Sequence, residues 1–159
     1  MKKILIVLIS SLTFLAISSS ANAIKVGALY LDTAGFFGEI KVGIEAAGAE
    51  EGIELTGANS QSDVAKESEF IDTLIAKGVD VVIMSPVSTD SSVAAVERLA
   101  EAGIPVVCYN TCLNDDDAAR LAYALVTTSQ RELGYPVGVM AGEWAIKAEI
   151  DLKIGIHNC

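Results

Sequence analysis

Residues 77–86, KGVDVVIMSP, decide the fold class of this chain. The glycine at position 78 follows an amphipathic segment, the apolar run VDVVIM comes next, and Ser85-Pro86 then breaks the run. An unbroken run of this kind is typical of a strand that is covered on both faces, as in a parallel sheet. We therefore predict a buried parallel strand at 79–84, with a helix ending at Gly78.

The same alternation continues on both sides of this stretch. Strands are predicted at 24–31, 53–58, 106–109, 121–127 and 152–157, helices at about 37–51, 64–77 and 90–102 and from Ser129 onward, and a polar turn at 114–117. Repeated strand–helix units with right-handed crossovers give an α/β, doubly wound parallel sheet. We expect about six strands with helices on both faces.

The last predicted helix carries two opposing local signals. Ser129 and Glu132 form a capping-box pattern, which favours a helix start. Pro136 lies too far into the helix to be tolerated freely, because it lacks the N–H that an interior turn requires. We expect either a kink or a delayed start.

Residues 1–23 have the pattern of an export signal. Lys2 and Lys3 form a basic start, an apolar stretch follows at 4–17, and residues 21–23, ANA, form a small-residue cleavage site. We predict export with cleavage after Ala23, which leaves a chain starting at Ile24. No later stretch has the pattern of a membrane span.

The chain is acidic, with a formal net charge of −10 over 159 residues. The export signal contributes two lysines and no acid, so the remaining chain is more acidic still. A surface of this sign repels phosphate backbones. Nucleic acid is therefore not expected as a partner.

Three cysteines are present, at positions 108, 112 and 159. Thiols of exported proteins tend to pair, and an odd number leaves one over. Cys108 and Cys112 are close enough to pair if the chain turns at Asn110, but Cys108 is equally well read as an inward-facing strand residue. Together with His157 they match no metal-site spacing, so no metal is expected.

Motifs for catalysis or nucleotide binding are missing. The turn after the first strand, 32–38, has only two glycines and two bulky rings, and the chain contains neither Gly-x4-Gly-Lys-Ser/Thr nor Gly-x-Ser-x-Gly. A nucleophilic mechanism would have to use His157 as its base. Asp32 and Asp90 have the chemistry of an acid and a base, but carboxylates at strand tips also bind hydroxyls without catalysing a reaction. We expect no enzyme and no cofactor.

The predicted site lies at the tips of three strands. The first tip is YLDTAGFF at 30–37, the second SPVS at 85–88 and the third YNT at 109–111. In an open α/β sheet, ligands bind outside the carboxyl ends of the strands. The adjacent rings of Phe36 and Phe37 follow a strand directly, where core packing does not demand them. We predict a small-molecule site, with a sugar as ligand.

The tips and their spacing resemble the N-terminal lobe of the type I periplasmic sugar-binding proteins, the solute receptors of ABC transporters for ribose, galactose and related sugars. The resemblance rests on GFF at 35–37, KGVDVVIMSP at 77–86, AGIPVV at 102–107 and LG at 133–134. It covers residues 24–159.

This resemblance implies roles for particular residues. Those matching Phe36 and Phe37 sandwich a sugar ring, although Phe37 is also read as the first core residue of its helix. Asn110 stands where the family usually has an aspartate that grips sugar hydroxyls, and Thr111 where ribose-type members carry arginine. Arg131 either reaches the ligand or faces solvent. Further candidates for hydroxyl contacts are Asp32, Thr33 and Ser85.

The family members have two lobes that close around the ligand. The resemblance implies that residues 24–159 form the N-terminal lobe, and we expect a truncated chain without the second lobe. The function it implies is the periplasmic substrate-binding component of an ABC transporter for a monosaccharide or related sugar. Its partners would be the membrane permease and a chemoreceptor or sensor. The alternatives are a periplasmic sensory adaptor or signal-molecule receptor of the same fold and an exported hydrolase.

Overall fold

The computed structural model describes residues 23–150 and 153. Five parallel strands form one sheet in the order β2-β1-β3-β4-β5. The strands are β1 (Lys25–Tyr30), β2 (Glu54–Asn59), β3 (Val81–Met84), β4 (Val106–Tyr109) and β5 (Ala122–Val126). The helices are α1 (Gly35–Glu50), α2 (Val64–Lys77), α3 (Val93–Glu101), α4 (Asp115–Leu121) and α5 (Gln130–Lys147). The predicted sixth strand at 152–157 lies outside the described residues apart from Lys153, as does the export signal up to residue 22.

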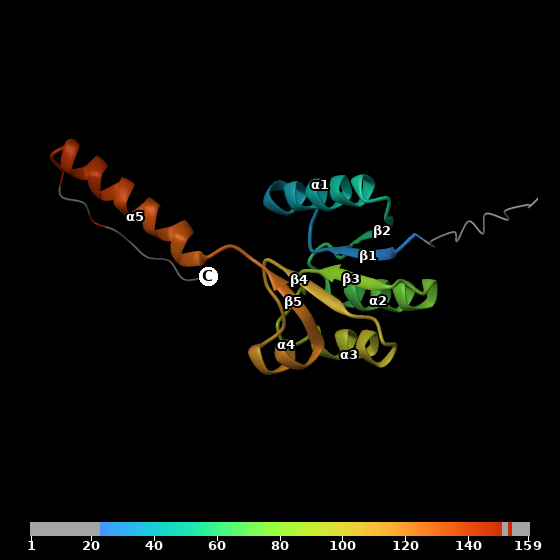
Figure 1. Ribbon diagram of the computed structural model, residues 1–159. Helices are drawn as coiled ribbons and strands as arrows, with labels where there is room; N and C mark the ends of the chain where they lie inside the picture. The colour runs from blue at the N-terminus through green and yellow to red at the C-terminus, as the bar shows by residue number, and fades with distance from the viewer. Residues whose placement is uncertain (1–22, 151–152, 154–159) are drawn as a thin grey trace, which may run out of the picture.

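Helices cover both faces of the sheet, which confirms the doubly wound fold (Figure 1). Helix α1 lies on one face, against β1 and β2, and α2, α3 and α4 lie on the other. Every strand pair is parallel; for example, Tyr30 pairs with Asn59 and Tyr109 with Val126. The carboxyl ends of all five strands therefore lie along one edge of the sheet.

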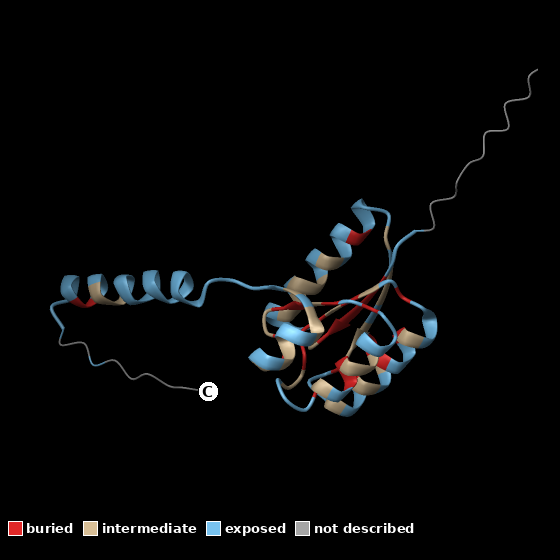
Figure 2. Ribbon diagram, turned by 60° about the horizontal axis from the view of Figure 1, so that its bottom comes forward, coloured by how far each residue is buried: buried red, intermediate tan, exposed pale blue. Residues whose placement is uncertain are grey.

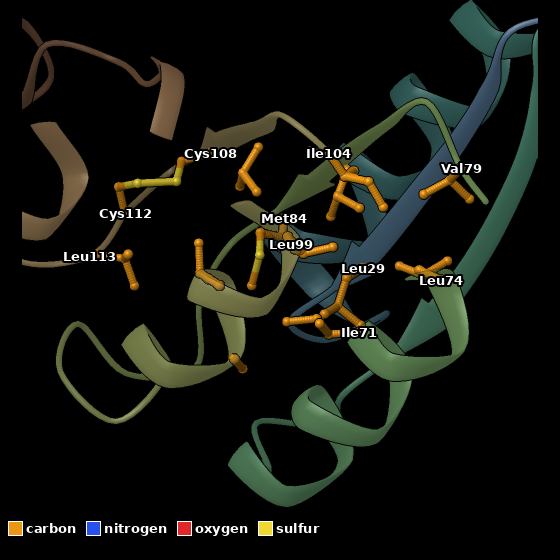
Figure 3. Close-up of a cluster of buried hydrophobic side chains, with 14 residues drawn as sticks. Leu29, Ile71, Leu74, Val79, Met84, Leu99, Ile104, Cys108, Cys112 and Leu113 are labelled. Atoms are coloured by element: carbon orange, nitrogen blue, oxygen red, sulfur yellow. A yellow bond between two sulfur atoms is a disulfide. The ribbon is translucent and has the colours of Figure 1, made fainter. Parts of the chain in front are cut away.

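The hydrophobic core lies between the sheet and the helices α2 and α3 (Figure 3). Fully buried side chains from the sheet meet fully buried side chains from these two helices, among them Leu29, Ile71, Leu74, Val82, Met84, Val96 and Leu99. The sheet and α2 approach closely at Gly27, where an added Cβ would lie 2.8 Å from Leu74 Cδ1. Burial of these aliphatic side chains contributes about 1.5–3 kcal/mol each.

Local signals set the ends of α2. The Asp63 carboxylate accepts hydrogen bonds from the N–H groups of Ala65 and Lys66, at 2.8 and 3.1 Å. These bonds satisfy donors that the first turn of a helix leaves free. At the other end Gly78 has a left-handed conformation with φ 63°, which stops the helix at the predicted residue.

The structure corrects the predicted turn at 114–117. Asn114 is the N-cap of the short helix α4, and its side-chain oxygen accepts a hydrogen bond of 3.1 Å from the Asp117 N–H. Acidic residues occupy the first turn of α4, where they are favourable at the positive end of the helix dipole. Because α4 extends to Leu121, β5 begins one residue later than predicted.

Helix α5 begins at Gln130, directly after Ser129, whose hydroxyl accepts a hydrogen bond of 3.2 Å from the Glu132 N–H. The alternative of a delayed start is therefore wrong, and the helix contains Pro136 in its interior. Helix α5 lies apart from the sheet and its other helices (Figure 1).

Most of α5 is exposed in the part of the chain that the structure describes (Figure 2). Its exposed apolar side chains include Leu133, Val137, Met140 and Trp144, the last with 60% of its surface accessible. Neither α5 nor any other described helix is long and apolar enough to cross a membrane.

Candidate functional site

The first side of the site is the turn that joins β1 to α1. Gly35 has φ 52°, a left-handed conformation that favours glycine, and it starts the helix. Gly38, one turn along, lies so close to the preceding loop that an added Cβ would be 2.9 Å from the Thr33 carbonyl oxygen. These two glycines allow the turn to close tightly over the sheet edge.

This tight turn displays the two aromatic rings. Phe36 is 61% exposed, whereas Phe37 is only partly exposed. Their ring centroids lie 5.2 Å apart with the planes at 78°, an edge-to-face contact. Phe37 therefore supports Phe36 by ring contact, and Phe36 remains largely exposed.

The second side of the site is the tip of β4. Asn110 has φ 62°, and its N–H donates a hydrogen bond of 3.0 Å to the carbonyl oxygen of Val126 at the end of β5. The hydroxyl of Thr127 in turn donates to the Asn110 carbonyl oxygen at 3.1 Å. The tips of β4 and β5 are thus held together around Asn110.

The Tyr109 side chain connects this tip to the first one. Its hydroxyl oxygen accepts a hydrogen bond of 3.3 Å from the Leu31 N–H. Burial raises the pKa of the Tyr109 hydroxyl, and the bond from the Leu31 N–H opposes that rise. The hydroxyl therefore stays neutral and fixes the distance between the β1 and β4 tips.

A hollow of about 280 Å³ lies between these tips. Its walls are Phe36, Ile40, Tyr109, Asn110, Val126, Thr127 and Thr128. The lining combines apolar surface with amide and hydroxyl groups, and within the described residues it includes no charged side chain. Such a lining suits a neutral ligand with both C–H surface and hydroxyl groups.

A second hollow, of about 570 Å³, also borders Asn110. A larger part of its lining is polar than in the first hollow. The lining residues are Thr89, Asn110, Thr111, Cys112, Leu113, Asn114, Asp115, Ala118, Leu125, Thr127, Thr128 and Gln130. Asn110, Thr127 and Thr128 line both hollows, so they form a wall that the two hollows share.

The predicted site residues thus fall into two groups. Phe36 and Asn110 line the first hollow, Phe37 supports Phe36, and Thr111 lines the second hollow. The remaining predicted residues, Asp32, Thr33, Ser85 and Arg131, line neither of these two hollows.

Each residue of the second group has another place in the structure. The carboxylate of Asp32 accepts a hydrogen bond of 2.6 Å from the Thr33 N–H, and the Thr33 hydroxyl accepts one of 3.2 Å from the Asn59 amide. Ser85 is buried, and its hydroxyl has no hydrogen-bond partner among the described residues. Arg131 lies on α5, with its guanidinium 5.7 Å from the centroid of the Tyr135 ring.

Thr127 and Thr128 line both hollows but were not among the predicted site residues. A signal was available, because Thr127 ends the predicted fifth strand, Thr128 follows it, and the carboxyl ends of parallel strands share one edge. The Tyr109 hydroxyl was also missed, since its role depends on a contact with Leu31, 78 positions earlier.

A disulfide joins Cys108 and Cys112, which lie four positions apart with a Cα–Cα distance of 5.3 Å (Figure 3). It encloses Asn110 and borders the second hollow. In the described ranges, 23–150 and 153, no group of three or more His, Cys, Asp or Glu side chains is placed to hold a metal ion.

Comparison with known proteins agrees with this fold. A family model described as a periplasmic binding protein domain matches residues 27–156. The chain therefore belongs to the periplasmic binding protein family, whose members bind solutes.

Among curated relatives, the ABC transporter periplasmic-binding protein YphF of Escherichia coli K12 is 38% identical over 144 residues, which are 89% of this chain and 44% of that protein. A xylitol-binding protein of Mycolicibacterium smegmatis is 29% identical over 102 residues, 64% of this chain and 29% of that protein. The chain spans less than half the length of these relatives.

Solved structures share the fold. The arabinose-transporter binding protein of Shewanella sp. ANA-3, bound to L-arabinofuranose, superposes with a TM-score of 0.69 at 23% identity, over 76% of this chain and 40% of that one. A Mycobacterium smegmatis protein in complex with β-D-fucofuranose gives 0.70 at 24% identity, over 79% of this chain and 41% of that one.

Proposed function

We propose that this chain supplies one lobe of the substrate-binding component of an ABC transporter, and that its ligand is a monosaccharide or a related polyol. The observation that carries the proposal is the uncharged hollow between the exposed Phe36 ring and Asn110. An aromatic face suits the C–H surface of a sugar, and amide and hydroxyl groups suit its hydroxyls. The family and the arabinofuranose and xylitol named for similar proteins support the same ligand class.

The proposal is for binding and not for catalysis. Export with cleavage after Ala23 would place the protein in the periplasm, where a permease in the membrane is the required partner. A chemoreceptor or sensor protein would read the same ligand-bound state. One lobe leaves part of a ligand exposed to water, so we propose that tight binding needs a second lobe.

Titration of the ¹⁵N-labelled protein with L-arabinose, D-ribose, D-galactose, xylitol and myo-inositol tests the proposal, because NMR shifts detect weak binding. We expect saturable shifts at Phe36, Asn110, Thr127 and Thr128 with at least one of these compounds. Shifts scattered over the surface, or none with any compound, would contradict the proposed function.

A variant pair separates ring contact from general destabilisation. Phe36→Ala should weaken sugar binding by about 1–3 kcal/mol, as expected when a contact ring is removed. Val42→Ala is the matched control, because Val42 lies on the same helix with 60% of its surface exposed and lines neither hollow. Equal sugar affinities of the two variants would show that the Phe36 ring does not contact the ligand.

A further inference from the structure

Asn110 occupies a strained turn. The Thr111 N–H donates a hydrogen bond of 2.7 Å to the Tyr109 carbonyl oxygen, two residues back, and Asn110 between them has φ 62°. This is a γ-turn of the rare type, in which the central residue has positive φ. Such conformations cost free energy and persist only where the surrounding structure imposes them.

The disulfide Cys108–Cys112 closes a ring around this turn. Both cysteines are buried, at 1% and 6% exposure, and belong to the core cluster, as does Leu113 (Figure 3). The two ends of the segment 109–111 are therefore fixed to the core and to each other. On its outer side, the bonds to Val126 and from Thr127 complete the enclosure.

We propose that the Cys108–Cys112 disulfide is a positioning element of the ligand site, which holds Asn110 in its left-handed conformation at the wall that the two hollows share. Without it, the segment 109–111 relaxes to lower-energy backbone conformations and the Asn110 amide leaves the wall. This inference rests on the proposed function for the identity of the ligand, but the backbone conformation can be tested without any ligand.

The ligand-free test compares the oxidised protein with the protein reduced by dithiothreitol. Reduction gives two cysteine thiols and converts dithiothreitol to its cyclic disulfide, so no other reagent is consumed. A Cys159→Ser background keeps the third thiol from exchanging with the pair. Amide hydrogen exchange is measured at Thr111, whose N–H donates to Tyr109 within the turn, and at Asn110, whose N–H donates to Val126 at the end of β5.

We expect exchange at these two amides to accelerate at least about tenfold on reduction, because the turn opens locally. Amides of β1 and β3 should keep their protection, which shows that the sheet remains folded. Unchanged protection at Asn110 and Thr111 in the reduced protein would overturn the inference. A Cys108→Ala/Cys112→Ala variant should behave as the reduced protein does and excludes an effect of the reductant.

The ligand arm uses whichever compound of the sugar panel binds the oxidised protein. Reduction should weaken its binding about tenfold or more, and Asn110→Gly should weaken it to a similar degree although glycine retains the positive φ. Full affinity in the reduced protein would overturn the positioning role. If no compound binds the oxidised protein, the proposed function fails, whereas the exchange measurement still decides the conformational claim.

Discussion

The Glu67 carboxylate on α2 accepts a hydrogen bond of 2.8 Å from the backbone N–H of Val87, in the loop that follows β3. Glu67 is fully buried, and its second carboxylate oxygen has no hydrogen-bond partner among the described residues. Val87 lies between Ser85 and Ser92, which are both buried, so the hydrogen bond anchors the loop between β3 and α3 to α2. A single carboxylate thus ties a helix to one of the three strand tips on which the site was predicted.

The titration of Glu67 should make the stability of the fold depend on pH. Burial raises the pKa of this carboxyl from its usual 4.5, and the neighbouring Ser92 hydroxyl and the Val87 N–H oppose the rise only in part. A raised pKa means that the folded state favours the protonated form. Its contribution to stability is therefore complete below pH 4.5 and is lost as the pH rises through the raised value.

Glu67→Gln removes this titration and keeps an oxygen acceptor for the Val87 N–H. We expect its stability relative to the native protein to increase from pH 4.5 to neutrality, as measured by urea unfolding. Glu67→Ala should instead lose about 1–3 kcal/mol, because the partly buried Val87 N–H is left without its acceptor. Glu69→Gln, at an exposed position of the same helix, is the control. Parallel pH profiles for Glu67→Gln and the native protein would refute the assignment.

Tyr30 should limit stability at alkaline pH. Burial, assisted by the nearby Glu45 carboxylate, raises the pKa of Tyr30 from 10.0 to about 12. The neutral phenol is favoured in the folded state, so the associated stability is lost as the pH rises from 10.0 toward 12.

Tyr30→Phe should reduce the loss of folding stability at alkaline pH, because phenylalanine does not ionise. At neutral pH it should change the free energy of unfolding by less than about 1 kcal/mol, since the hydroxyl has no hydrogen-bond partner among the described residues. Unfolding by urea after brief exposure to alkaline buffer measures both effects. Tyr123→Phe, at a position 81% exposed on β5, provides the comparison. The same alkaline loss in both variants would argue against Tyr30 as its source.

Asp63 should contribute to stability as the cap of α2. Asp63→Ala leaves the N–H groups of Ala65 and Lys66 without their acceptor and should cost about 1 kcal/mol. Asp63→Asn keeps a side-chain oxygen in place and should cost much less. Thermal unfolding measures the loss of stability in the two variants. Equal losses would show that Asp63 does not stabilise the protein by capping α2.

The sequence predicted those parts of the fold that local patterns determine. The strand that ends at Met84 and the helix that stops at Gly78 are each determined by residues adjacent in the chain. The pairing of Phe36 with Asn110 across one hollow also followed, because the ends of parallel strands meet at one edge. The polar residues from Asn114 onward were misread as a turn, although an N-cap residue before an acidic first turn is a helix signal.

Other features depend on distant contacts that a local pattern does not contain. The fifth strand was predicted, but which side chains at its end line the hollow depends on its packing beside β4 and α1, so Thr127 and Thr128 were not included in the site. Asn110 has a positive φ and its N–H donates to the Val126 carbonyl oxygen at the end of β5, a contact that no local pattern contains. The periodicity of α5 predicted a helix but not that its apolar side chains would be exposed.

Trp144 on α5 is the single tryptophan of the chain. Indole fluorescence therefore reports on α5 alone and is blind to the hollow beside Phe36. In this chain the emission should have the long wavelength of an indole in water, since the ring is 60% exposed. A shift to shorter wavelength, in a longer chain or with a partner added, would show directly that something has covered this helix.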